Sequence, residues 1–423
     1  MMSESTRTTR RAFMLSAAAA LAASPAAAQE TLLEILQSPR RGNWDDQFDS
    51  AGSRTAVREV ASNLPIFSPQ TVSYVERAID TYRGIVSSGG WPTVPAGNKL
   101  KLGVKDPAVG ILRQRLAISG DLPRSAGGGN AFDSYVKSAV QRFQRRHGLP
   151  DDGVIAQYTF AMMNVSADVR LGQLETNLVR LRSMSGFLGN RYVMVNIPAA
   201  AIEVVENDRV VQRHTAVVGK IDRQTPILSS KIHEVILNPY WTSPASIVEK
   251  DIIPLMQKDA TYLTRNSIRL FDPSGNEVPP ESIDWFSRQA IEMNLTFRQD
   301  PGKNNAMAST KINFHNPHAV YMHDTPQQSL FGQIERFHSS GCVRVQNVRD
   351  LVSWLLRDTP GWSRREIENA IARGDNQPIQ LVEPVPVYFT YVSAWSTNDG
   401  VAHFRNDIYA RDGVDELLVS QAL

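Results

Sequence analysis

The sequence predicts an α+β multidomain protein, with a mostly helical N-terminal half followed by a β-rich half. Apolar residues recur at helical spacing up to about residue 188. From Tyr192 onwards apolar and polar residues alternate with a period of two, which is typical of strands. The 423 residues suffice for two to four domains, and the hydrophobic fraction of 42% suits a globular protein. No interior run offers the roughly 18 apolar residues of a membrane span.

Residues 1–28 are predicted to be an export signal. Arg10 and Arg11 precede Phe13 and an apolar run that reaches Ala23, and small residues follow at 26–28. Paired arginines in this position are typical of twin-arginine export, which predicts a periplasmic protein. The segment holds three arginines and one glutamate, so its net charge equals the formal +2 of the whole chain. The mature chain is therefore near neutral, and no nucleic-acid partner is expected.

The helical half is predicted to contain a scaffold interrupted by a compact module. Residues 29–97 form the first part of the scaffold and residues 166–190 a helix that packs back on it. Residues 98–165 form a three-helix unit. Asp106 and Asp133 are its predicted N-caps, and a third helix covers 158–163.

The β-rich half is predicted to comprise residues 191–244 and 311–423, with an inserted lid at 245–310. Helices are expected at 246–258 and 281–293 of the lid. Its polar, breaker-rich composition favours a mobile cover over a second core, with Trp285, Phe286 and Phe297 as apolar anchors. After a final strand near 385–391, Asp399-Gly400 predicts a hairpin turn, and His403 is expected at the surface.

Cys342 is the single cysteine of the chain, and His323 lies 19 residues before it. An exported protein with one cysteine cannot form an internal disulfide, which favours a reactive thiol over a buried structural one. A neighbouring imidazole can take the thiol proton, so the pair suits acyl transfer through a thioester. His315, His318 and His323 form the alternative, a metal site, but their spacing fits no zinc pattern. No metal or cofactor is expected.

The residues around this pair predict a site. Tyr321 and His323 share one face of a strand. Ser339-Ser340-Gly341 predicts a turn, and a helix is expected to start near Asn347. Cys342 would then lie on a short turn between Gly341 and that helix, where backbone N–H groups could bind an oxyanion.

These motifs resemble those of the L,D-transpeptidases of bacterial cell-wall synthesis, which have a YkuD-like catalytic domain. The resemblance covers His323 and the run Ser339-Ser-Gly-Cys-Val-Arg344. Many members carry His between the Ser and the Gly. Here Ser340 takes that place and His338 lies two positions upstream, which leaves open which side chain helps to hold the oxyanion. Residues 139–153 resemble the type 1 peptidoglycan-binding domain, as in the long Gram-negative type of the family.

The resemblance implies a β-sandwich catalytic domain with a helical capping insertion, and a set of residue roles. Cys342 is the nucleophile and His323 the base that then acts as acid. Oxyanion or substrate contacts are assigned to Tyr321, Ser340, Gly341 and Arg344. Trp241 is expected either to contact substrate as an aromatic wall of the cleft or to pack in the core. Either a backbone carbonyl or Asp324 orients His323, and for Arg344 a structural ion pair is the alternative.

The implied reaction is formation of 3→3 cross-links between peptidoglycan stem peptides. Peptidoglycan stem peptides and glycan are the implied partners, and β-lactams such as carbapenems the implied inhibitors. Water as acceptor would give an L,D-carboxypeptidase, and a protein amine would give protein anchoring. A non-catalytic peptidoglycan-binding scaffold is the alternative from another class. The sequence specifies neither the acceptor nor the oligomeric state.

Overall fold

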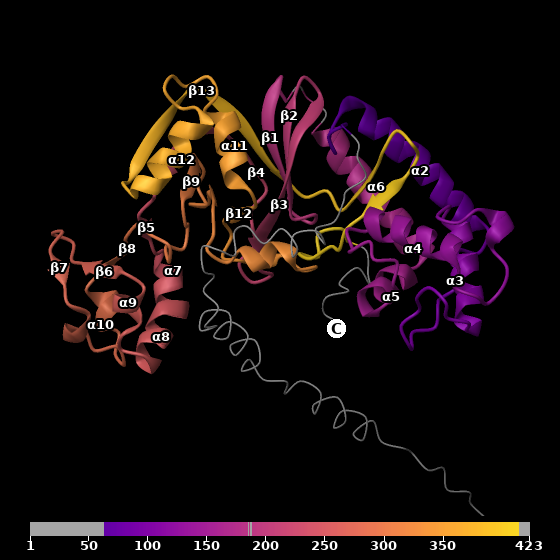
Figure 1. Ribbon diagram of the computed structural model, residues 1–423, viewed down its shortest axis with the longest axis horizontal. Helices are drawn as coiled ribbons and strands as arrows, with labels where there is room; N and C mark the ends of the chain where they lie inside the picture. The colour runs from indigo at the N-terminus through magenta and orange to yellow at the C-terminus, as the bar shows by residue number, and fades with distance from the viewer. Residues whose placement is uncertain (1–62, 185, 187, 414–423) are drawn as a thin grey trace, which may run out of the picture. The chain divides into compact units, whose positions relative to one another are not determined.

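A nine-stranded sheet is the main element of the C-terminal half (Figure 1). The computed structural model describes residues 63–184, 186 and 188–413, so the predicted export signal and the start of the 29–97 scaffold lie outside the described residues. The strands are ordered β11-β3-β12-β10-β9-β4-β13-β1-β2. Their bounds are β1 Arg191–Asn196, β2 Ala201–Glu206, β3 Arg209–Gly219, β4 Leu228–Leu237, β9 Thr310–Phe314, β10 Met322–His323, β11 Phe337–Ser339, β12 Val343–Val345 and β13 Gln377–Thr390.

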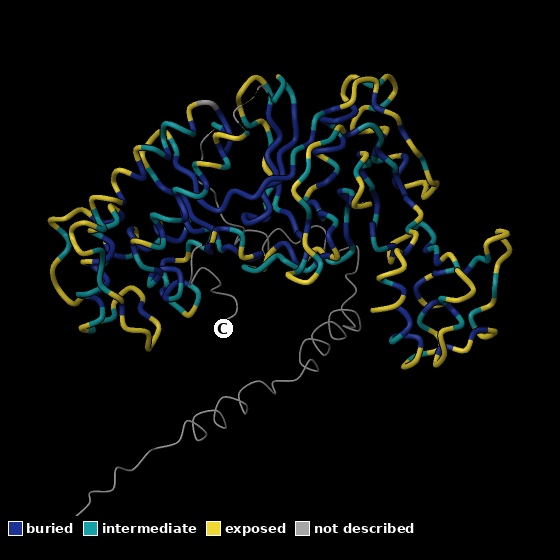
Figure 2. The backbone as a smooth tube through the Cα atoms, turned by 180° about the vertical axis from the view of Figure 1, so that it is seen from behind, coloured by how far each residue is buried: buried dark blue, intermediate teal, exposed yellow. Residues whose placement is uncertain are grey.

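Strand β3 closes this sheet on itself. The first part of β3 pairs antiparallel with β2, and its later residues Ala216 and Val217 pair with β12. The inward side chains consequently form one core, which helices α11 (Val348–Leu355) and α12 (Arg364–Arg373) complete. Figure 2 shows the central strands as largely buried backbone. The predicted α+β fold class is confirmed.

The scaffold helices α2 (Pro69–Ser87) and α6 (Ala167–Ser183) pack against each other as predicted. Ser68 caps α2 by accepting a hydrogen bond from the backbone N–H of Thr71. The apolar faces of both helices share a core with β1 and with the hairpin of β14 (Ala394–Ser396) and β15 (Ala402–Phe404). The turn predicted at Asp399-Gly400 joins these two strands.

The three-helix module contains α3 (Pro107–Ile118), α4 (Ser134–Arg146) and α5 (Gln157–Asn164). The carboxylates of Asp106 and Asp133 accept from Ala108 N and Val136 N, so both predicted N-caps are confirmed. Apolar side chains of the three helices form the module's own core. A buried ion pair joins Asp121 to Arg146, with Nε–Oδ1 and Nη2–Oδ2 distances of 2.8 and 2.6 Å.

The insertion differs from the lid predicted at 245–310. Helix occupies 245–258 as expected, but as α7 (Ala245–Ile247), a π-helical turn η4 (Val248–Ile252) and α8 (Ile253–Lys258). The second predicted helix is wrong over most of its length, because only α10 (Gln289–Glu292) forms in 283–293. The remaining elements are α9 Tyr262–Arg265, the 3-10 turn η5 Pro280–Ser282, β5 Trp241–Thr242, β6 Ile268–Phe271, β7 Glu277–Val278 and β8 Thr296–Gln299.

These strands form a separate four-stranded sheet, β5-β8-β6-β7, which the sequence reading missed. Trp285 and Phe297 are buried in an apolar core together with Val248 and Leu263. The insertion is therefore a folded unit with its own core, which corrects the expectation of a coreless cover. The anchor predicted at Phe286 is wrong, since 80% of this residue's surface is exposed.

Candidate active site

Parallel pairing of β10 with β12 brings the predicted catalytic residues together. Met322 lies opposite Val343, and both side chains are fully buried in the core. His323 lies opposite Arg344 on the other face of the sheet. Tyr321 and Cys342 lie one position earlier on their chains, and Val343 N donates to Tyr321 O at 3.0 Å. Cys342 is thus a diagonal neighbour of His323 on the same face.

The backbone carbonyl of Asp324 orients the imidazole of His323. Its oxygen lies 2.5 Å from Nδ1, and because a carbonyl only accepts, Nδ1 carries the proton. Nε2 is then the unprotonated, basic nitrogen of the ring. The carboxylate of Asp324 serves another purpose, since it accepts from Ser309 Oγ at 2.5 Å and from Thr325 N at 2.8 Å. The sequence left either a backbone carbonyl or the Asp324 side chain to orient His323, and in the structure the carbonyl contacts the ring.

Burial keeps both members of the pair uncharged at neutral pH. Desolvation, with a further contribution from Arg344, lowers the pKa of His323 to about 3. Burial raises the pKa of the Cys342 thiol, and hydrogen bonds from the backbone and hydroxyl of Tyr321 oppose that rise. The resting site is consequently a neutral thiol beside a neutral imidazole, and the thiol proton must leave as the nucleophile attacks.

This electrostatic state predicts the pH dependence of alkylation. Because the thiol pKa is raised, the rate of Cys342 alkylation by iodoacetamide should increase with pH and reach half its maximum above about pH 8.5. A cysteine–histidine ion pair would instead hold a thiolate from about pH 4 upwards. Stopped-flow or mass-resolved alkylation between pH 5 and 10 measures the profile, and a reactive plateau below pH 7 would contradict a neutral pair.

The nucleophile turn is held by its own side chains. Ser339 Oγ donates to Cys342 O at 2.5 Å and accepts from Gly341 N at 3.1 Å. Gly341 has φ +111°, and a Cβ there would lie 3.4 Å from Gln224 O. Helix α11 begins directly after Asn347, so the predicted helix start is confirmed. Strand β12 lies between Cys342 and this helix, so the short turn expected between Gly341 and the helix is wrong.

Trp241 and Tyr321 link the insertion to the thiol. Trp241 lies in β5, close to Tyr321. Burial and the neighbouring Cys342 raise the pKa of Tyr321, and Trp241 acts against that rise. The Tyr321 ring packs edge-on against His323 with centroids 5.6 Å apart. The phenol therefore remains protonated and can donate to sulfur or to substrate.

Two cations lie beside the thiol. Within the described residues no acidic side chain lies at ion-pair distance from Arg344, whose Nη1 donates to Gln327 Oε1 at 2.7 Å and whose buried Nε has no hydrogen-bond partner. Burial lowers the pKa of Arg344 to about 10, whereas Cys342 acts to raise it. The structural ion pair considered as its alternative role is not formed among these residues.

Lys311 is the second cation, and the sequence reading missed it. It lies opposite His323 on β9, its Nζ is 4.4 Å from the centre of the Tyr321 ring, and burial lowers its pKa. The alternation of residues along a strand shows from the sequence alone that Lys311 and Ile312 point to opposite faces. The sequence does not show that β9 pairs with β10, and this pairing is what aligns Lys311 with His323.

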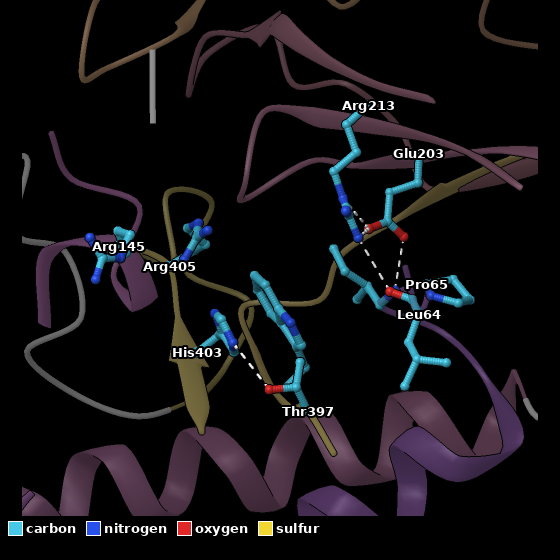
Figure 3. A pocket seen from close by; sticks show the side chains of 10 residues that line it. Leu64, Pro65, Arg145, Glu203, Arg213, Thr397, His403 and Arg405 are labelled. Atoms are coloured by element: carbon cyan, nitrogen blue, oxygen red, sulfur yellow. Dashed lines mark hydrogen bonds and ion pairs between the residues drawn. The ribbon is translucent and has the colours of Figure 1, made fainter. Parts of the chain in front are cut away.

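A small cavity lies apart from this cluster (Figure 3). Its volume is about 30 Å³, enough for a water molecule, and its lining includes Glu203, Arg213 and His403. His403 is buried and stacks on Trp395 with centroids 5.1 Å apart, so its predicted surface position is wrong. None of the residues around Cys342 lines this cavity.

Two domain models match the chain. Residues 190–365 match the L,D-transpeptidase catalytic domain, YkuD, and residues 105–163 match the "Putative peptidoglycan binding domain". A "Putative L,D-transpeptidase" of Haemophilus influenzae is 32% identical over 241 residues, which are 57% of this chain and 48% of the relative. The chain thus spans about half the length of this curated relative.

Several solved structures are similar to parts of the chain. The L,D-transpeptidase from Mycobacterium smegmatis is 14% identical over 48% of this chain and 58% of its own, with a TM-score of 0.24. The L,D-transpeptidase from Stackebrandtia nassauensis is 13% identical over 71% and 96%, with a TM-score of 0.25. With TM-scores this low, the assignment depends on the domain matches and the sequence relative. On those grounds, residues 190–365 are similar to the catalytic domain of L,D-transpeptidases, and residues 105–163 are similar to a peptidoglycan-binding domain.

Proposed function

We propose that this protein is a peptidoglycan L,D-transpeptidase that works through a Cys342 thioester. The observation that carries the proposal is the placement of Cys342, His323, Tyr321 and Arg344 on one face of two neighbouring parallel strands. A lone structural cysteine would need neither an imidazole nor two cations beside it.

The proposed reaction has two acyl-transfer steps. Cys342 Sγ attacks the carbonyl of the third residue of a tetrapeptide stem, and its proton passes to His323 Nε2. The same proton goes to the leaving nitrogen as the C–N bond breaks and D-alanine departs. An amine of a second stem then attacks the thioester, gives its proton to His323, and forms the 3→3 cross-link. Sulfur regains that proton and leaves as the thiol.

Charge complementarity supports an anionic donor. Arg344 and Lys311 lie beside Cys342, and within the described residues neither is at ion-pair distance from a carboxylate. A stem peptide carries carboxylates at its D-alanine end and along its side chains. The guanidinium fork of Arg344 suits one of these groups.

The choice of acceptor and the role of the insertion are further parts of the proposal. Trp241 of the insertion lies close to Tyr321, so the insertion would border the acyl-enzyme. An insertion in this position would restrict the access of water to the thioester, and so favour attack by an amine over hydrolysis. L,D-carboxypeptidase or protein-anchoring activity on the same thiol is the alternative.

The proposed activity also implies where the protein works and which compounds inhibit it. The module would hold the protein on peptidoglycan, which lies outside the cytoplasmic membrane, in keeping with export to the periplasm. Within residues 63–184, 186 and 188–413, every helix is too short or too polar to cross a bilayer. A strained β-lactam carbonyl, as in a carbapenem, would acylate the thiol as the stem carbonyl does.

The test is incubation of the purified protein with a disaccharide-tetrapeptide. We expect free D-alanine, and a cross-linked dimer in excess over tripeptide, both quantified by mass spectrometry. A carbapenem should add its full mass to the protein on Cys342. Absence of D-alanine release together with absence of the adduct would favour a non-catalytic peptidoglycan-binding scaffold. Excess tripeptide would favour the carboxypeptidase.

A further inference from the structure

A loop outside the nucleophile motif holds the nucleophile turn from the other side. Lys220 N donates to Ser339 O at 3.0 Å, and Thr225 Oγ1 donates to Gly341 O at 2.9 Å. The loop is itself tight, since a Cβ at Gly219 would lie 2.2 Å from Arg223 O, and a Cβ at Gly341 of the turn would lie 3.4 Å from Gln224 O of the loop. Residues 219–225 are thus packed against the turn that carries Cys342.

Arg223 extends this loop to both the turn and the insertion. Its Nη1 donates to Ser340 Oγ at 3.0 Å. The same guanidinium makes a two-pronged ion pair with Asp251, with Nη1–Oδ2 and Nη2–Oδ1 distances of 2.6 and 3.0 Å. Only 16% and 14% of the two side chains are exposed, so the pair is largely shielded from water. Asp251 lies in the π-helical turn η4, and turns of this kind are frequent at functional sites.

The direction of these hydrogen bonds determines what Ser340 can do. A guanidinium only donates, so the Ser340 oxygen must accept from Arg223. The hydroxyl proton of Ser340 is therefore turned away from Arg223 and is available to another acceptor. Ser340 itself is exposed. Within the described part of the chain, no acceptor for this proton is formed.

Two backbone donors of the turn are already engaged within the protein. Gly341 N already donates to Ser339 Oγ, and Val343 N donates to Tyr321 O. Neither N–H is free for an oxygen that becomes negative during attack by Cys342. A side-chain donor in the turn would replace what these two amides do not supply.

We propose that Ser340 Oγ–H donates to the oxyanion formed on the attacked carbonyl, and that Arg223 and Asp251 are the positioning residues that aim it. The inference rests on the proposed acyl transfer and extends it, because it makes a side chain of the insertion part of the active centre. The donor is preorganised: Asp251 fixes Arg223, and Arg223 fixes the rotation of the hydroxyl.

The experiment measures D-alanine release from the disaccharide-tetrapeptide by the full-length protein and its variants. Ser340→Ala should lower kcat by about 10²-fold, since loss of one oxyanion donor costs at least that much. Asp251→Ala should lower kcat by roughly tenfold with KM nearly unchanged, because the donor remains but is no longer aimed. The double variant Ser340→Ala/Asp251→Ala should be no slower than Ser340→Ala alone, because Asp251 acts only through Ser340. Arg223→Lys, which keeps the charge but cannot pair in two prongs, should resemble Asp251→Ala.

Two controls separate positioning from structural damage. Asp300→Ala breaks a similar ion pair within the insertion, in which Asp300 Oδ1 lies 2.6 Å from Arg269 Nη2, and it should leave kcat unchanged. Alkylation of Cys342 by iodoacetamide develops no oxyanion, so its rate should be the same in wild type and in all variants.

The outcomes are distinct. Three results would each overturn the inference while the proposed function stands. One is a double variant whose loss in kcat is the sum of the two single losses. The others are a loss in alkylation rate as large as the loss in kcat, or a wild-type kcat for Asp251→Ala and Arg223→Lys. A wild-type protein that releases no D-alanine contradicts the proposed function, and the inference falls with it.

Discussion

Replacing Cys342 by serine is expected to abolish D-alanine release and 3→3 cross-linking, with a loss of at least about 10³-fold in rate. A hydroxyl is far less acidic and less nucleophilic than a thiol. The site gives serine no compensation, since the pKa of His323 is lowered to about 3 and the imidazole is a weak base. The measurement is mass-spectrometric quantification of D-alanine and dimer.

The fold of this variant should persist, because the two side chains are similar in size. Cys342 is only partly buried at the edge of the main core. Thermal unfolding and binding to intact sacculi serve as controls and should match the wild type. Cross-linked product above background from a pure Cys342→Ser sample would contradict a thioester mechanism.

Replacing Asp121 by alanine is expected to destabilise the protein by about 3–5 kcal/mol, the usual effect of removing one partner of a buried ion pair. Asp121 is the carboxylate at Arg146, and both side chains are at most 6% exposed. Arg115 and Arg170 are buried nearby, and burial together with the charge of Arg146 lowers the pKa of Arg115 to about 9. Without Asp121, Arg146 would be a buried, unpaired cation close to two others.

Urea unfolding measures this effect, and Asp151→Ala is its matched control. Asp151 pairs with Arg145 in the same module at 3.1 Å, but about a third of each side chain is exposed. Its loss should therefore cost less than about 1 kcal/mol. Equal shifts in the two variants would show that burial does not determine the strength of the Asp121–Arg146 pair.

The parts of the fold that follow from short-range signals were predictable. The N-caps at Asp106 and Asp133 precede their helices directly, and the alternation around Tyr321 and His323 identifies a strand without its partners. The proximity of His323 to Cys342 was inferred from chemistry, not from pairing.

The rest depends on partners distant in sequence. Strands β5 and β8 of the insertion are two and four residues long, and they pair across more than fifty residues. Local composition carries little information about such pairs, so the sheet was missed. Trp285 and Phe286 are adjacent and both aromatic, yet one is 7% and the other 80% exposed. Lys311 and Arg223 reach the site only through strand register and loop packing, so neither was recognised.

The ends of the insertion lie on adjacent strands. Leu237 at the end of β4 pairs with Thr310 at the start of β9, and Asn238 N donates to Ser309 O at 2.9 Å. Residues 239–308 therefore leave and rejoin the large sheet one strand spacing apart, about 4.8 Å. Loop-closure entropy grows only as the logarithm of length, so each doubling of the segment costs about 0.6 kcal/mol. This junction can accept segments of very different size without disturbing the register of β4 and β9. We therefore expect it to be a position where gene rearrangement exchanges whole subdomains, and where a chimeric protein can be spliced.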